Sequence, residues 1–305
     1  MARDRVRYYF SRALKAGQLT TDGIIQAIVS PVEITYRGYT YSFIDSHQEF
    51  LNDGSTEYIF AHLVKFTRNG EVETVNTSSK KTDTESVSNL VEVSCTFIYI
   101  PNYQIICFQN IWNGLERDQF HARFKELIEA KHGNFFVNCT LEPVTDLRNF
   151  LRRISNFDKI SKISAKISPP NPLFSPVWKT LKEYLKKRAL EEAKISERAN
   201  SGGAINSDLT KLAKVIVQDG SSLEQILAEK FPEKTFDMAD AAVFMAADGY
   251  GSATVEGQEK GIFIIVKTKD NHKSFLFLRS PEHRELYAAA FPVVDSINKE
   301  SLLGH

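Results

Sequence analysis

The segment that decides the fold is DLRNFLRRISNFDKISKISAKISPPNP, residues 146–172. Its apolar spacing predicts a helix over residues 147–154 and a strand over residues 159–167. The proline-rich corner at 168–172 ends the strand, because proline cannot donate to a sheet ladder. The chain before this segment is rich in β-branched and aromatic residues, and the chain after it is more acidic. The segment therefore joins two halves of different composition.

A long basic helix is expected to follow the proline-rich corner, from about residue 176 to residue 200. Its apolar residues recur at helical spacing and leave a broad polar face. These residues are Trp178, Leu181, Leu185 and Leu190. Asn200-Ser-Gly-Gly203 is typical of a flexible linker. We therefore predict a β-rich α+β domain (1–172), the long basic helix with its linker (173–200), and a smaller α+β domain (201–305).

The first predicted domain has an α+β fold, with a mainly antiparallel sheet and helices on one face. Arg37-Gly38 and Pro101-Asn102 each mark the turn of a β-hairpin. Residues 115–131 have the apolar spacing of an amphipathic helix. Asn69-Gly70 is a further turn signal, and the polar residues 74–89 predict a surface loop.

The predicted C-terminal domain combines helices with a small sheet. Helices are expected over residues 222–231 and 238–247. Ser280-Pro281-Glu282 opens a terminal helix, with the serine as its N-cap. The strands of the small sheet are predicted over residues 251–256, 261–267 and 274–278.

The composition narrows the class of protein. The chain of 305 residues is 42% hydrophobic and has a formal net charge of zero, so bulk charge favours no class of partner. Cys95, Cys107 and Cys139 lack the CxxC spacing of a zinc site, which predicts buried free thiols in a reducing cytosol. No signal peptide and no apolar run of membrane-spanning length occurs. We therefore expect a cytoplasmic protein with no membrane partner.

Charge is distributed unevenly along this neutral chain. Residues 151–194 hold 11 Lys or Arg against 4 Asp or Glu, a net charge of +7, whereas residues 205–261 hold 5 lysines against 10 acids, a net charge of −5. The basic segment predicts a face that binds nucleic-acid phosphates, of DNA or RNA, or a partner protein. The predicted binding residues are Arg152, Arg153, Lys162, Lys166, Lys182, Lys186, Lys187 and Arg188. The alternative is a solvated face paired with the acidic segment, an arrangement that would also favour a homo-oligomer.

No motif for catalysis or for a cofactor fits its required context. Gly249-Tyr250-Gly251 lacks the strand-then-helix context of a phosphate-binding loop, so turn glycines explain it better. Glu259-Lys260 near Asp248 lacks the spacing of a metal-dependent nuclease site. We therefore assign no catalytic residue and expect no cofactor.

Two further sets of residues each allow a functional and a structural interpretation. Asp45, His47 and His62 would converge on a metal only if their strands are adjacent, and polar residues at strand ends explain them equally well, so we expect no metal. The aromatic residues of the first sheet would form either a stacking platform for bases or simply core, and we favour core. They are Tyr36, Tyr39, Tyr41, Phe43, Phe97, Tyr99 and Tyr103.

The order of motifs resembles a family of uncharacterised bacterial proteins, a domain-of-unknown-function family found among phage-defence genes. The resemblance rests on a strand ending at Ile167, the Pro-Asn-Pro corner with a long helix after it, and the late segment 246–251 before a short sheet. It implies a host-defence role and transfers no catalytic residue. We therefore expect a component of an antiviral system that binds nucleic acid or a partner protein. The alternatives are a metal-dependent nuclease of such a system and a scaffold or oligomerisation protein.

Overall fold

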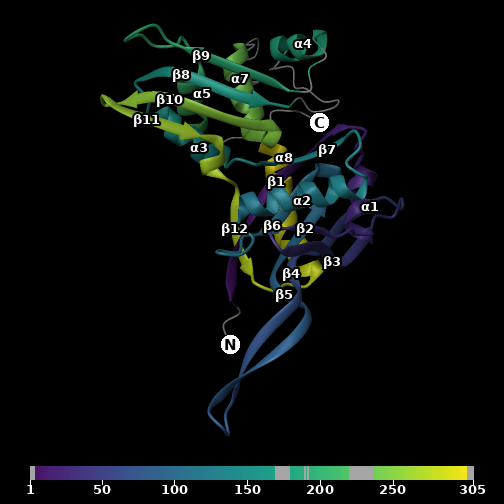
Figure 1. The fold of residues 1–305 in the computed structure, drawn as a ribbon. Helices are drawn as coiled ribbons and strands as arrows, with labels where there is room; N and C mark the ends of the chain where they lie inside the picture. The colour runs from purple at the N-terminus through teal and green to yellow at the C-terminus, as the bar shows by residue number, and fades with distance from the viewer. Residues whose placement is uncertain (1–3, 169–178, 189, 191, 220–235, 301–305) are drawn as a thin grey trace. The chain divides into compact units, whose positions relative to one another are not determined.

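The computed structural model describes residues 4–168, 179–188, 190, 192–219 and 236–300 (Figure 1). The predicted helix over 222–231 and the predicted start of the long basic helix lie outside these residues. The packing of Cα atoms divides the chain into two units. The first comprises residues 1–8, 15–140 and 276–288, and the second comprises residues 9–14, 141–275 and 289–305.

The larger sheet has eight strands in the order β12-β1-β6-β5-β4-β3-β2, and β7 also pairs with β1. Every pair for which a register is known within it is antiparallel. Its strands are β1 (Arg5–Gly17), β2 (Ile34–Tyr36), β3 (Tyr39–Phe50), β4 (Thr56–Asn76), β5 (Lys81–Ile100), β6 (Ile105–Gln109), β7 (Val137–Pro143) and β12 (Ser274–Leu278). With the helices below, this confirms the predicted α+β class.

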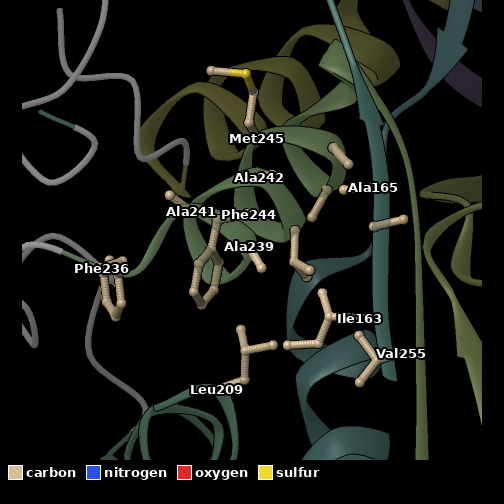
Figure 2. Close-up of a cluster of buried hydrophobic side chains, with 14 of the residues drawn as sticks. Ile163, Ala165, Leu209, Phe236, Ala239, Ala241, Ala242, Phe244, Met245 and Val255 are labelled. Atoms are coloured by element: carbon tan, nitrogen blue, oxygen red, sulfur yellow. The ribbon is translucent and has the colours of Figure 1, made fainter. Parts of the chain in front are cut away.

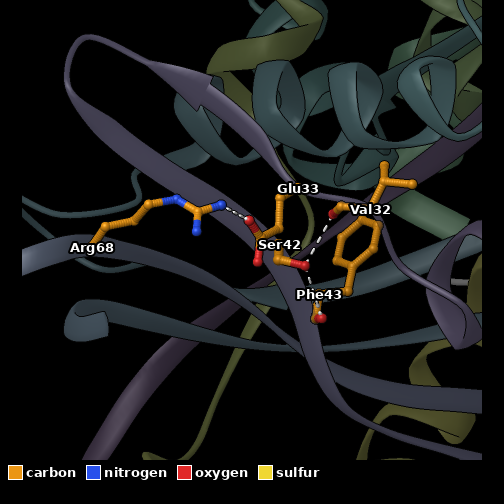
Figure 3. Close-up of polar contacts among 5 residues, drawn as sticks. All are labelled: Val32, Glu33, Ser42, Phe43 and Arg68. Atoms are coloured by element: carbon orange, nitrogen blue, oxygen red, sulfur yellow. Dashed lines mark hydrogen bonds and ion pairs between the residues drawn. The ribbon is translucent and has the colours of Figure 1, made fainter. Parts of the chain in front are cut away.

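The first predicted hairpin is confirmed as β2 and β3. Arg37 and Gly38 have φ angles of 51° and 82°, the left-handed conformation that a two-residue hairpin turn requires. The chain entering β2 is held by polar contacts (Figure 3). The Ser42 hydroxyl donates to the carbonyl oxygen of Val32 over 3.0 Å, and the side chain of Glu33 forms an ion pair with Arg68 of β4.

Two helices, α1 (Thr21–Val29) and α2 (Arg117–Lys131), belong to the first unit, which holds most of this sheet. Phe43 of β3 lies 5.3 Å from Phe124 of α2, measured between ring centroids, so α2 packs on this face of the sheet. Phe43 and Phe97 are almost completely buried, which agrees with aromatic side chains that serve as core. Tyr39 and Tyr103 are half-buried, and Tyr36 is exposed over 39% of its surface.

The predicted turn at Asn69-Gly70 and the predicted loop over 74–89 are both wrong. β4 and β5 continue past the other strands as a two-stranded antiparallel ribbon, residues 69–88, which closes at a tight turn near Lys80 (Figure 1). The β-branched Thr and Val residues of this segment favour extended backbone, and the partner strand supplies the hydrogen bonds that a loop would take from water. The side chains of this ribbon are mostly exposed, so the segment has few apolar residues, and a polar stretch of this kind predicts a loop.

The smaller sheet has four strands in the order β11-β10-β8-β9 and lies within the second unit. Its strands are β8 (Lys159–Ile167), β9 (Ala193–Arg198), β10 (Gly251–Glu259) and β11 (Ile262–Lys267). Described helices of this part of the chain are α3 (Leu147–Ser155), α4 (Lys179–Lys187), α5 (Leu209–Asp219), α7 (Met238–Met245) and α8 (His283–Glu300), of which α8 contributes residues to both units. The helix over 147–154 and the strand over 159–167 are thus confirmed.

The core of the second unit forms between the smaller sheet and its helices (Figure 2). Helix α7 is buried on all sides, since every residue from Ala239 to Met245 is at most 2% exposed. Small alanine side chains let this helix approach the strands closely, while Phe244 packs against Phe236 with 5.4 Å between ring centroids. Ile163 and Val255 meet this core from the sheet.

Two further expectations are corrected. The long basic helix ends at Lys187, and residues 193–198 form β9, because the edge of β8 offers a ladder of backbone hydrogen bonds to this segment. Residues 274–278 form β12 of the larger sheet, not a strand of the smaller one. The smaller sheet therefore takes strands from both sides of residue 200, and the two units do not follow the ranges 1–172, 173–200 and 201–305.

Candidate nucleic-acid interface

Strand β8 separates an apolar face from a basic face. Alternate side chains of a strand point to opposite faces of its sheet. One set is buried against the helices and consists of Ile163, Ala165 and Ile167. The other set consists of Lys162, Ser164 and Lys166, of which Lys166 is 56% exposed.

Cross-strand pairing extends this basic surface over all four strands, because residues directly opposite each other on neighbouring strands share a face. We call the resulting surface the open face. It is formed by Lys162, Ser164 and Lys166 of β8, Lys194, Ser196 and Arg198 of β9, Ser252, Thr254 and Glu256 of β10, and Phe263, Ile265 and Lys267 of β11.

The open face combines exposed cations with small hydroxyl groups and a hydrophobic margin. Lys194, Arg198 and Lys267 are exposed, and the central positions between them carry Ser or Thr. At the β11 edge, Phe263 is 53% exposed and Ile265 is 43% exposed. These two side chains give the basic surface a small exposed apolar margin.

Two of the five cations of the open face form ion pairs. The Nζ atom of Lys162 lies 2.7 Å from a carboxylate oxygen of Glu256, and the Nζ atom of Lys166 lies 2.7 Å from a carboxylate oxygen of Glu192. The hydrogen bond to Glu192 raises the pKa of Lys166, so this side chain keeps its charge at neutral pH. The other three cations form no ion pair with any described residue, which leaves them available for an anionic ligand.

The structure brings together only part of the predicted binding set. Lys162 and Lys166 lie on the open face. Arg152 and Arg153 are exposed on α3, which belongs to the helical layer, the helices that form the core with the other face of the smaller sheet. Lys187 and the adjacent Arg188 are exposed at the end of α4.

Helix α4 itself belongs to the helical layer, because Leu181 and Leu185 are buried in the core that contains α7. Lys182 and Lys186 lie on this helix, but their side chains are outside the described part of the structure. Sequence reasoning missed Lys194, Arg198 and Lys267. The alternation Lys-x-Ser-x-Arg over residues 194–198 indicates that Lys194 and Arg198 share one strand face.

The glycine motif over residues 249–251 has a structural role. Gly249 has a φ of 86°, and the carbonyl oxygen of Asp248 accepts a hydrogen bond from Nε of Arg12 over 2.9 Å. The Arg12 guanidinium lies 4.6 Å from the ring centroid of Tyr250. A Cβ atom on Gly251 would approach the carbonyl oxygen of Lys166 to 2.0 Å, so only glycine fits where β10 begins. These contacts confirm the interpretation as turn glycines.

The residues of the other combinations weighed from the sequence make local contacts. The backbone N–H of Lys260 donates to the carboxylate of Asp158, which holds the turn between β10 and β11. In the larger sheet, Nδ1 of His62 lies 3.2 Å from the Thr96 hydroxyl. All three cysteines are buried and free, as predicted.

A comparison with protein-family models finds a match to a family described as a domain of unknown function (DUF4747), over residues 24–230. The matched range covers more than half of the chain and includes β8 and β9 of the open face. A comparison with curated proteins gives no match. No helix of the described residues is long and apolar enough to cross a membrane.

Proposed function

The chain belongs to the DUF4747 family, and we propose that it is a cytoplasmic component of a bacterial antiviral system that binds single-stranded nucleic acid through the open face. The observation that carries the proposal is the set of five cations that cross-strand pairing places on one face of the smaller sheet, four of them exposed and Lys162 half-buried. Phosphates of a nucleic-acid backbone are attracted to such a surface without regard to base sequence.

A single strand suits the open face better than a duplex. Single strands expose base faces, which would stack on an aromatic side chain such as Phe263, while the cations of the open face would contact the phosphates. Ser and Thr hydroxyls at the centre of the face supply neutral hydrogen-bond partners for sugar and base edges. A duplex would present mainly its phosphates to this surface and would leave Phe263 unused.

The test compares two triple variants with the same change in net charge. The first carries Lys194→Gln, Arg198→Gln and Lys267→Gln on the open face. The control carries Arg152→Gln, Arg153→Gln and Lys187→Gln in the helical layer. Fluorescence anisotropy with labelled single-stranded RNA, single-stranded DNA and duplex DNA measures each affinity.

We expect the first variant to lose most of its affinity for single strands and the control to keep the wild-type affinity. Equal loss in both variants would show that only net charge matters, and no binding by the wild type at low salt would contradict the proposal. Cleavage of the oligonucleotides in the presence of Mg²⁺ would instead favour the metal-dependent nuclease.

A further inference from the structure

A β-bulge in β3 redirects the end of that strand. Before the bulge, Phe43 pairs with Leu63 and packs against α2. Three residues of β3, ending at His47, then oppose two residues of β4, because Asp45 adopts a left-handed φ of 50°. The extra residue reverses which side chains face α2. His47 and Glu49 consequently lie on the sheet face opposite to that of Phe43.

Three potential metal ligands meet on this redirected face. They are His47, Glu49 and His283, and one ligand atom from each lies within 4.8 Å of the others. Nε2 of His47 is 3.1 Å from a carboxylate oxygen of Glu49, and the rings of His47 and His283 have centroids 3.8 Å apart. All three residues belong to the first unit, and each is partly accessible to solvent.

The surroundings orient His283 for such a role. Nδ1 of His283 lies 2.9 Å from the hydroxyl of Tyr58, which leaves Nε2 as the free ring nitrogen. Tyr58 is itself fixed by stacking on Tyr287, with 4.3 Å between ring centroids, and Tyr287 donates to Glu57 over 2.9 Å. Metal-binding histidines commonly have their second nitrogen held by such a hydrogen bond.

We propose that His47, Glu49 and His283 form a binding site for a divalent transition metal ion of the zinc type. Two imidazoles and one carboxylate are a ligand set that Zn²⁺ accepts, with a fourth position left for water. Tetrahedral bonds of about 2.0 Å place neighbouring ligand atoms about 3.3 Å apart, close to the separation of His47 and Glu49. The ligand atom of His283 lies within 4.8 Å of the other two, so the site would close by side-chain rotation when the metal binds.

This site does not depend on the proposed nucleic-acid interface, because it lies in the other unit and uses other residues. It revises the expectation that the chain binds no metal. It also replaces the combination of Asp45, His47 and His62 considered from the sequence. Asp45 builds the bulge, whereas His62 is bonded to Thr96.

The test uses the full chain, purified without a histidine tag and freed of metal by a chelator. Calorimetric titration with Zn²⁺ should give one ion per chain, and Co²⁺ should show the visible absorption of a tetrahedral site. His47→Ala, Glu49→Gln and His283→Ala should each abolish stoichiometric binding. Tyr58→Phe should weaken binding by about 10- to 100-fold, because it removes the contact that orients His283.

The matched control is His62→Gln, which removes a histidine from the same sheet. It should leave both the stoichiometry and the affinity at their wild-type values. Circular dichroism of each metal-free variant establishes that it is folded. The proposal is overturned if the folded wild type takes up no stoichiometric Zn²⁺, or if the three ligand variants bind Zn²⁺ as the wild type does.

Discussion

Glu256 limits how much positive charge the open face presents, so its neutralisation should strengthen nucleic-acid binding. Its carboxylate lies 2.7 Å from Nζ of Lys162, and both side chains are partly buried, with exposures of 19% and 26%. Glu256→Gln keeps the size of the side chain and removes its charge. Lys162 then becomes available to a phosphate, beside the three cations that have no ion pair among the described residues.

The magnitude follows from counterion release. For a single strand, the slope of log K against log salt concentration is about −0.7 for each phosphate that is neutralised. Three contacts give a slope of about −2, and a fourth contact from Lys162 steepens it to about −3. At 0.1 M salt one added contact raises the affinity about fivefold. Loss of the ion pair should lower the free energy of unfolding by about 1 kcal/mol or less.

The assay is a salt titration of single-strand binding by fluorescence anisotropy, carried out on the wild type, Glu256→Gln and Glu197→Gln. Glu197 is exposed on β9 but pairs with Ile163, so it lies on the other face of the sheet and controls for net charge. An unchanged slope for Glu256→Gln, or the same gain in affinity for both variants, would refute the reasoning.

Three further predictions concern stability and reactivity. Burial raises the pKa of Asp240 from its ordinary value of 3.8 to about 6, so its stabilising contribution is complete below about pH 4 and is lost as the pH rises through 6. The free energy of unfolding of Asp240→Asn should therefore rise by about 2 kcal/mol relative to that of the wild type between pH 4 and pH 7, measured by urea unfolding at both pH values. Gly251→Ala should lower the free energy of unfolding by more than about 2 kcal/mol, whereas Gly261→Ala, whose Cβ meets nothing within 4 Å, should lower it by only about 1 kcal/mol, as thermal unfolding will show. Burial raises the pKa of Cys139 to about 12, so this thiol should resist alkylation in the native protein and react only after denaturation; rapid labelling of the folded chain would contradict this.

Local turn chemistry predicted some hairpins and failed for others. Arg37-Gly38 forms a turn because both residues adopt left-handed backbone and their flanking strands are the nearest available partners. Asn69-Gly70 carries a similar signal, yet these residues pair with Ser88 and Val87 of a strand that lies further along the chain. Pairing with β5 offers many more hydrogen bonds than a turn at Gly70 would, and the turn propensity of two residues does not outweigh them.

The candidate binding surface shows the same limit. Lys162 and Lys166 are four residues apart on a predicted strand, so their common face follows directly from the alternation of side chains. Lys194 and Lys267 reach that face only through pairing with distant strands, which no local pattern encodes. The sequence around Lys194 predicts a helix, because its charge continues that of α4, whereas its strand character depends on the free edge of β8.

The metal site depends on an even smaller feature. His47-x-Glu49 places two ligands on one strand face, and this spacing is visible in the sequence. His283 follows Glu49 by 234 residues in the sequence, so only the tertiary fold brings its ring close to His47 and Glu49. The left-handed conformation of Asp45 decides which face receives these ligands, and an aspartate in a strand gives no sequence signal for a bulge.

The two-stranded ribbon over residues 69–88 has a consequence for how the molecule opens. Each amide in it is protected by its single partner strand alone, and nearly every side chain is exposed, so little apolar surface opposes separation of the strands. Its amides should exchange with solvent long before those of the paired segment 93–100, where Cys95 and Phe97 are buried. Cleavage by a protease near Lys80 would leave the strand pairs in the body of the sheet intact. The ribbon can therefore be opened, cut or extended without unfolding that sheet.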